Sequence, residues 1–218
     1  MQRRVFIGAV AAAVCAPALA DEDSEALWRR LQKGGYVVLM RHAVTVPGIG
    51  DPPGFKLADC STQRNLSEEG RRDARQIGAA FRGKSIPIAS VLSSRWCRCI
   101  DTAKLAFDRV EPAPMLDSMF IDDAAARRSK LAALRTRLAA FRNGGNLVLV
   151  TNDVNIRALI DRYVNQGDMV VATIEAGGAL KALGVLKPAD LRKLASRASS
   201  VAADSGPICT STSLPAWS

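Results

Sequence analysis

Three short apolar runs in the chain are each followed directly by residues that can do chemistry: Arg41-His42, the block 93–98 with Arg98 at its end, and Thr151-Asn152-Asp153. His42 is the only histidine among the 218 residues. A neutral imidazole is a nucleophile, and the forked guanidinium of arginine binds phosphate oxygens in pairs. These residue types together suit an anionic group such as a phosphate, held for in-line transfer to the imidazole.

Buried strands of a parallel sheet are the elements that would bring these residues together. The runs 36–40, 88–92 and 147–150 have the length and composition of such strands, and helical patterns alternate with them. Later strands are predicted at 169–174 and 179–186. We therefore expect an α/β fold, a three-layer α/β/α sandwich with a mostly parallel central sheet. Ligands bind such sheets beyond the carboxyl ends of the strands, where the three segments would meet.

The predicted helices begin at polar residues and end near glycine. Ser24 and Ser67 are expected to start the first two helices. The helical patterns cover residues 24–31, 67–82, 96–107, 124–141, 156–160 and 188–198. The chain between the first two strand–helix units, residues 43–65, is predicted to be a loop, and a turn is expected at Pro112 and Pro114.

Four sequence blocks, in order, resemble the histidine phosphatase superfamily, which includes phosphoglycerate mutases, acid phosphatases and phytases. The blocks are Leu39-Met40-Arg41-His42-Ala43, Leu66-Ser67-Glu68-Glu69-Gly70, Ser93-Ser94 with Arg98 and Thr102-Ala103, and Leu149-Val150-Thr151-Asn152. Each block falls where the predicted parallel sheet needs it. The resemblance implies a phosphatase that works through a phosphohistidine and needs no metal.

The resemblance assigns a role to each matching residue. His42 would be the nucleophile that becomes phosphohistidine. Arg41 and Arg98 would hold the phosphoryl oxygens, and their charges should lower the pKa of His42. Thr45 would be a further contact to the phosphate. Asn152 stands where the family has a second histidine, and its amide can donate a hydrogen bond but carries no charge. Losing such a donor costs about 10²–10³ in rate, so turnover is expected to be impaired.

Several acids could protonate the leaving group. Asp153 resembles the acid that phytase-like members carry beside their second histidine, and a carboxyl beside a bound phosphate suits that role. Asp153 could instead cap the helix that follows it, because aspartate is a favoured cap. The alternative acids are Asp117, Asp122 and Asp123, in the segment where mutase-like members keep theirs.

The first twenty residues read as a secretory signal peptide. Arg3 and Arg4 precede an apolar run, and Ala18-Leu19-Ala20 forms a cleavage site before Asp21. The two arginines also resemble a twin-arginine export signal. We therefore expect a periplasmic or secreted protein with no membrane span after cleavage. The predicted organisation is a signal peptide over 1–20, a histidine-phosphatase-like domain over 21–187, and a C-terminal helix with a loose tail over 188–218.

Composition restricts the partners. The net charge is +9, but aromatic residues make up only 5% of the chain and the arginines are scattered, which argues against nucleic acid. Past the signal peptide, an even number of cysteines permits disulfides in an oxidising compartment, with the pairing left open: Cys60, Cys97, Cys99 and Cys209. One histidine and a C-x-C spacing make a zinc site improbable.

Two functional hypotheses follow. The first is an exported phosphatase that hydrolyses phosphate monoesters through His42, with no cofactor. The alternative is a catalytically degenerate protein of the cell envelope that binds phosphate or a phosphoglycan. In both, the partner is a small phosphorylated substrate or an envelope phosphate group. A mutase, which needs a cytosolic sugar phosphate, is disfavoured by the predicted export signal.

Overall fold

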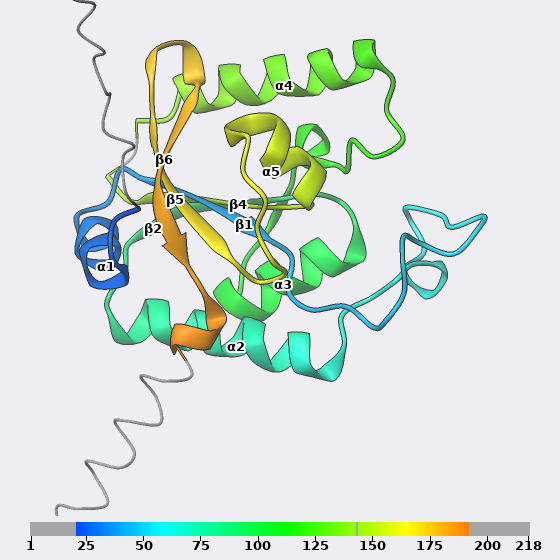
Figure 1. The fold of residues 1–218 in the computed structure, drawn as a ribbon, viewed down its shortest axis with the longest axis horizontal. Helices are drawn as coiled ribbons and strands as arrows, with labels where there is room; N and C mark the ends of the chain where they lie inside the picture. The colour runs from blue at the N-terminus through cyan, green and yellow to red at the C-terminus, as the bar shows by residue number, and fades with distance from the viewer. Residues whose placement is uncertain (1–20, 143, 192–218) are drawn as a thin grey trace, which may run out of the picture.

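A computed structural model describes residues 21–142 and 144–191 of the chain. Within these residues a single mixed sheet lies between two layers of helices (Figure 1). The helices are α1 (Ser24–Lys33), α2 (Glu68–Gly83), α3 (Cys97–Phe107), α4 (Ala124–Ala139) and α5 (Asp153–Ile160). The strands are β1 (Val37–Arg41), β2 (Ile88–Ser93), β3 (Glu111–Pro112), β4 (Asn146–Thr151), β5 (Met169–Ile174) and β6 (Leu180–Leu186). The predicted three-layer α/β/α sandwich is confirmed.

The sheet has the strand order β3-β2-β4-β1-β5-β6. Pairs β2–β3, β2–β4 and β1–β4 are parallel, whereas β5 runs antiparallel to both β1 and β6. Arg41 at the end of β1 lies opposite Thr151 at the end of β4. The carboxyl ends of β1, β2 and β4 therefore meet at one edge of the sheet, as the sequence predicted.

Alternate residues of the strands pack into two separate cores, one on each face of the sheet. On one face, Val38 and Met40 of β1 pack with residues of α1, α2 and α3. On the other, Val37 and Leu39 pack with residues of α4 and α5. Strands covered on both faces have no polar side to show, which explains the continuous apolar runs in the sequence. The two cores fix the strand ends that carry the site.

Local contacts hold the start of α2 against the chain that follows β1. Ser67 caps α2, because its Oγ accepts a hydrogen bond from the Gly70 N–H at 3.1 Å. A Cβ on Gly70 would lie only 2.0 Å from the carbonyl oxygen of Val44, so only glycine allows this approach. The second matching block thus has a packing role that supports the segment after His42.

Most predicted elements are confirmed within two residues of their expected ends. Four differ in detail. Helix α5 begins at Asp153, three residues before its expected start. Asp23, and not Ser24, caps α1. The turn expected at Pro112 and Pro114 contains β3 and a 3-10 helix, Pro114–Leu116. The helix expected at 188–198 begins at Pro188, but the described residues end at 191.

The predicted signal peptide and loose tail lie outside the described residues. Among the helices that are described, none combines the length and apolar character needed to cross a membrane.

Candidate active site

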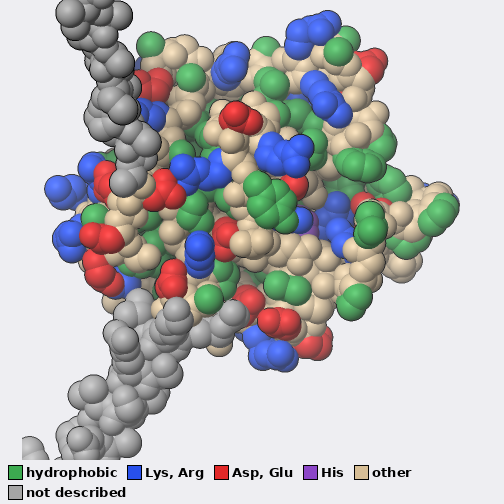
Figure 2. Space-filling view, in the orientation of Figure 1, with side chains coloured by type: hydrophobic (Ala, Val, Ile, Leu, Met, Phe, Trp, Pro, Cys, Tyr) green, Lys and Arg blue, Asp and Glu red, His purple; other side chains and the backbone are tan. Residues whose placement is uncertain are grey.

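A cavity of about 560 Å³ opens at the carboxyl edge of the parallel strands. Five of the predicted site residues line it: Arg41, His42, Arg98, Asn152 and Asp153. They come from the ends of β1 and β4 and from the first turns of α3 and α5. Basic and apolar side chains lie side by side around this hollow in Figure 2. The topology therefore brings together residues that lie up to 112 positions apart in the sequence.

His42 lies at the bottom of the cavity, with 3% of its surface exposed. Its Nδ1 is 2.9 Å from the carbonyl oxygen of Ala43. A carbonyl can only accept, so Nδ1 carries the proton and Nε2 keeps its lone pair. Burial, followed by the charges of Arg98 and Arg41, lowers the pKa of His42 to about 3. The imidazole is therefore neutral, as a nucleophile must be.

Three buried polar atoms without a hydrogen-bond partner surround the same cavity: Arg41 Nε, Arg64 Nε and Asp153 Oδ1. Buried polar groups are nearly always satisfied, so a cluster of such atoms needs an explanation. Two of them are cationic donors and one is a carboxyl oxygen. A phosphate ester supplies what each lacks, namely anionic oxygens for the donors and a leaving oxygen for the carboxyl group.

Arg41 is held so that part of its guanidinium remains available. Its Nη1 donates to the carbonyl oxygen of Val164 at 2.8 Å, and the guanidinium lies 5.8 Å from the centre of the Tyr163 ring. The Asp153 carboxylate is 3.9 Å away from Nη1. The guanidinium is oriented by the chain after α5, while its Nε has no partner.

Arg98 is 6% exposed and is held by two side chains that accept its hydrogen bonds. Its Nη1 donates to Asp51 Oδ1 at 2.8 Å, and its Nε and Nη2 donate to Asn152 Oδ1 at 3.3 and 3.0 Å. The amide nitrogen of Asn152 lies toward the buried Cys99, with Nδ2 3.8 Å from Sγ. The expectation that Asn152 donates to the phosphate does not fit this geometry, because its oxygen holds Arg98 and its nitrogen is directed at a thiol.

Asp51 belongs to the site, although the sequence did not single it out. Its carboxylate accepts hydrogen bonds from Arg98, from Trp96 Nε1 at 3.0 Å and from the Arg64 N–H at 3.0 Å. Burial opposes its charged form, but the bond from Arg64 and the charge of Arg98 outweigh burial and lower the pKa of Asp51. One carboxylate thus gathers the loop, the start of α3 and the chain before α2 around the cavity.

Asp153 is the first residue of α5, and the cap position is Asn152. The alternative role of Asp153 as the helix cap is therefore wrong. Its carboxyl group instead lines the cavity, with Oδ1 buried, without a hydrogen bond and 3.9 Å from Arg41 Nη1.

The three alternative acids have other partners and do not line the cavity. Asp117 is buried and bonded to the Arg95 guanidinium at 2.6 and 2.8 Å. Asp122 pairs with Lys130 at 2.6 Å. Asp123 caps α4.

Thr45, which the resemblance placed among the phosphate contacts, does not line the cavity. It is buried, and its Oγ1 accepts a hydrogen bond from Gln166 Nε2 at 3.2 Å. It also forms an isolated β-bridge with Leu66. Thr45 therefore stabilises the chain after β1. The cavity is lined by Arg64 and not by Thr45.

A disulfide joins the loop to the helix that carries Arg98. It links Cys60 to Cys97 at the first residue of α3. Cys99 is free and buried, and burial raises the pKa of its thiol to about 12, so it is inert at neutral pH. Cys209 lies outside the described residues. The disulfide fixes one end of the loop beside the cavity.

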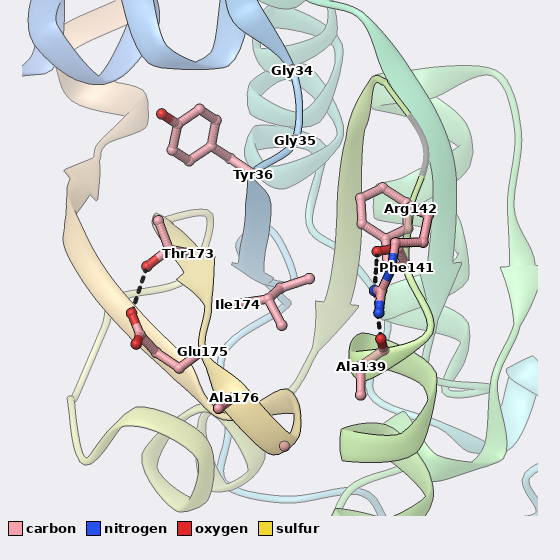
Figure 3. A pocket seen from close by; sticks show the side chains of 11 residues that line it. Gly34, Gly35, Tyr36, Ala139, Phe141, Arg142, Thr173, Ile174, Glu175 and Ala176 are labelled. Carbon is pink, nitrogen blue, oxygen red and sulfur yellow. Dashed lines mark hydrogen bonds between the residues drawn. The ribbon is translucent and has the colours of Figure 1, made fainter.

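A second cavity, of about 700 Å³, lies near the start of β1 and the end of β5 (Figure 3). Its charged side chains are engaged locally: Arg142 donates to the carbonyl oxygens of Ala139 and Phe141, and Glu175 accepts from Thr173 at 3.3 Å. It holds no nucleophile beside cations. No group of three or more potential metal ligands occurs among the described residues, so neither cavity carries a recognisable metal site.

Comparison with known protein families agrees with this architecture. The sequence model of the histidine phosphatase superfamily (branch 1) matches residues 37–122, from β1 to the segment before α4. No protein with a curated description matches the chain significantly.

Three solved structures illustrate the shared fold. The protein histidine phosphatase SixA, complexed with tungstate, is 17% identical, with a TM-score of 0.51 over 72% of this chain and 99% of SixA. The alpha-ribazole phosphatase of Shigella flexneri is 17% identical, with a TM-score of 0.51 over 68% and 96%. A phosphoserine phosphatase mutant from Entamoeba histolytica, in complex with phosphoserine, is 13% identical, with a TM-score of 0.51 over 70% and 97%. At these identities the likeness concerns the fold.

Proposed function

We propose that the chain is a member of the histidine phosphatase superfamily, whose sequence model matches residues 37–122, and that it hydrolyses phosphate monoesters through a phosphohistidine on His42. The observation that carries the proposal is the neutral, buried His42 with a free Nε2, surrounded by cationic donors that lack partners. A nucleophile and oxyanion-binding groups in one cavity are the parts that phosphoryl transfer requires.

In the first step His42 Nε2 attacks phosphorus, and the bond from phosphorus to the ester oxygen breaks. Asp153 gives its proton to that oxygen, so that an alcohol leaves. In the second step Asp153 accepts a proton from water, whose oxygen attacks phosphorus and releases His42 and inorganic phosphate. Arg41 and Arg98 hold the phosphoryl oxygens through both steps. The substrate is a small phosphate ester or a phosphate group of the cell envelope.

A second candidate function is phosphate binding without efficient turnover. The observation that favours it is the contact of Asn152 Oδ1 with Arg98, at 3.0 Å from Nη2. The second histidine of the family would bring a charged donor to this position, whereas Asn152 holds Arg98 instead. The site would then retain its affinity for oxyanions and lose much of its rate.

We further propose that the protein acts outside the cytosol. The Cys60–Cys97 disulfide supports this location, because disulfides persist in oxidising compartments and are rare in the cytosol. The arginine-led apolar segment before Asp21 supports export in the same way.

Turnover of p-nitrophenyl phosphate, measured together with tungstate binding, tests the proposal. The unmodified protein should bind tungstate and release nitrophenol, whereas His42→Ala should bind tungstate through its arginines and release none. Thr45→Ser, a change outside the cavity, serves as the control and should retain turnover. Tungstate binding without turnover in the unmodified protein would favour the second candidate function. Absence of both would contradict both candidates.

A further inference from the structure

Large apolar side chains are exposed almost nowhere on the described part of the molecule except around this cavity. The five that are exposed are Val46, Ile49, Phe120, Ile121 and Tyr163. Three of them line the cavity, and the Tyr163 ring faces the Arg41 guanidinium. Phe120 and Ile121 are 75% and 73% exposed. Exposed apolar groups gathered in one patch mark a binding surface, whereas isolated ones need no explanation.

The walls between this apolar rim and the phosphate-binding residues are apolar as well. Phe55 packs on the indole of Trp96, with ring centres 5.8 Å apart, and both residues line the cavity. Pro52, Pro53 and Val154 complete this lining. Because Trp96 Nε1 donates to Asp51, the polar atom of the indole is already satisfied. The walls therefore offer surface for burial and few free hydrogen-bonding groups.

Most polar side chains of the lining are already engaged with other groups of the protein. Among the charged lining residues, Arg41 pairs with Asp153 and Arg98 pairs with Asp51. Arg64 donates to the carbonyl oxygen of Gly48, and Ser118 carries the only hydroxyl of the lining. The Ser118 Oγ accepts from the Phe120 N–H at 3.4 Å, so it is directed at the backbone. A sugar or an amino acid ester needs several hydrogen-bond partners or a countercharge beyond its phosphate. The outer part of this cavity supplies neither.

We propose that the outer cavity binds an apolar alkyl or aryl group, so that the preferred substrates are phosphate monoesters of apolar alcohols. This inference rests on the proposed function, because it takes the inner residues as the phosphate site. A volume of about 560 Å³ is in the range of small-molecule pockets and exceeds what a phosphate alone fills. Phosphate on the arginines directs the ester's carbon chain outward, along Trp96 and Phe55 to the rim.

The direct test compares kcat/KM for ethyl phosphate, hexyl phosphate and glucose 6-phosphate. All three are esters of primary alcohols, so the chemical step is similar and binding makes the difference. One fully buried methylene strengthens binding about fourfold, so the four additional methylenes of hexyl phosphate should give at least about a tenfold gain over ethyl phosphate. Glucose 6-phosphate should rank below hexyl phosphate. Equal kcat/KM for all three esters would overturn the inference and leave the phosphatase function standing.

Variants at the rim distinguish binding of the alkyl group in this pocket from nonspecific binding to the protein surface. The double variant Phe120→Ser/Ile121→Ser changes two exposed side chains and should lower the hexyl-to-ethyl ratio at least fivefold. Val46→Ser is the matched control, because Val46 is an exposed apolar residue of the loop after β1 and does not line the cavity. An unchanged ratio in the double variant, or an equal loss in both variants, would overturn the inference.

Binding of unreactive phosphonates keeps the test valid if the protein turns over nothing. Hexylphosphonate should bind at least tenfold more tightly than methylphosphonate in calorimetry, and Phe120→Ser/Ile121→Ser should reduce the difference. That result without turnover would support the apolar pocket and reject the phosphatase proposal. Equal binding of the two phosphonates would reject the apolar pocket.

Discussion

Burial of His42 predicts a specific loss of stability in acid. The pKa of His42 in the folded protein is about 3, whereas a histidine in the unfolded chain titrates near 6.5. Between these values the unfolded chain binds a proton that the folded protein does not. The contribution of His42 to stability is therefore fully present above pH 6.5 and is lost as the pH falls toward 3.

The size of the effect follows from the difference between the two pKa values. Each pH unit within this window costs about 1.4 kcal/mol, so lowering the pH from 7 to 4.5 should remove about 2.5 kcal/mol of unfolding free energy. Urea unfolding of the protein and of His42→Asn, in buffer without phosphate, measures it. Carboxylates titrate equally in both proteins, so the difference between their pH profiles isolates His42. Parallel profiles would refute the assignment of a buried, neutral imidazole.

Three further changes test other parts of the site. Asp153→Asn should slow hydrolysis of alkyl phosphates about 100-fold and that of p-nitrophenyl phosphate much less, because only poor leaving groups need a proton; equal losses would exclude Asp153 as the acid. Asn152→His should raise kcat about tenfold or more in initial-rate assays, because an imidazolium adds the charged donor that the amide does not provide. A folded variant that is no faster than the unmodified protein would place residue 152 outside the reaction. Replacing Cys60 and Cys97 by serine opens a loop of 37 residues and should lower the free energy of unfolding in urea by about 4 kcal/mol. Reductant should have no further effect on this variant. An unchanged midpoint of urea unfolding would mean that the disulfide does not form.

The elements and their common edge could be predicted because their signals are local. A buried strand is a short apolar run, and the chemistry of a parallel sheet lies directly after such runs. Arg41 is the last residue of β1 and Asn152 directly follows β4, so their meeting place is set by topology once the sheet is known. The caps at Ser67 and Asp123 depend on residues only three positions away.

The remainder of the site depends on contacts between distant residues in a loop of irregular structure. Asp51 is held by groups 13, 45 and 47 positions away, and no periodic pattern records such pairings. The same loop decides that Arg64 lines the cavity and Thr45 does not. The sequence also left the disulfide partner of Cys60 undetermined, because Cys97 comes close to it only once α3 is packed. The sequence marks Asp51 only as a charged residue in the loop between the first two matching blocks, which does not single it out as part of the site.

In the proposed mechanism the phosphoryl group passes through Nε2 of His42. The most direct measurement is mass spectrometry of the protein quenched in base during turnover, with peptide mapping of the phosphoryl group. One phosphoryl group is expected on His42, lost on brief exposure to acid and absent from His42→Ala. Steady turnover with no phosphoryl group on His42, or with one on another residue, would contradict it.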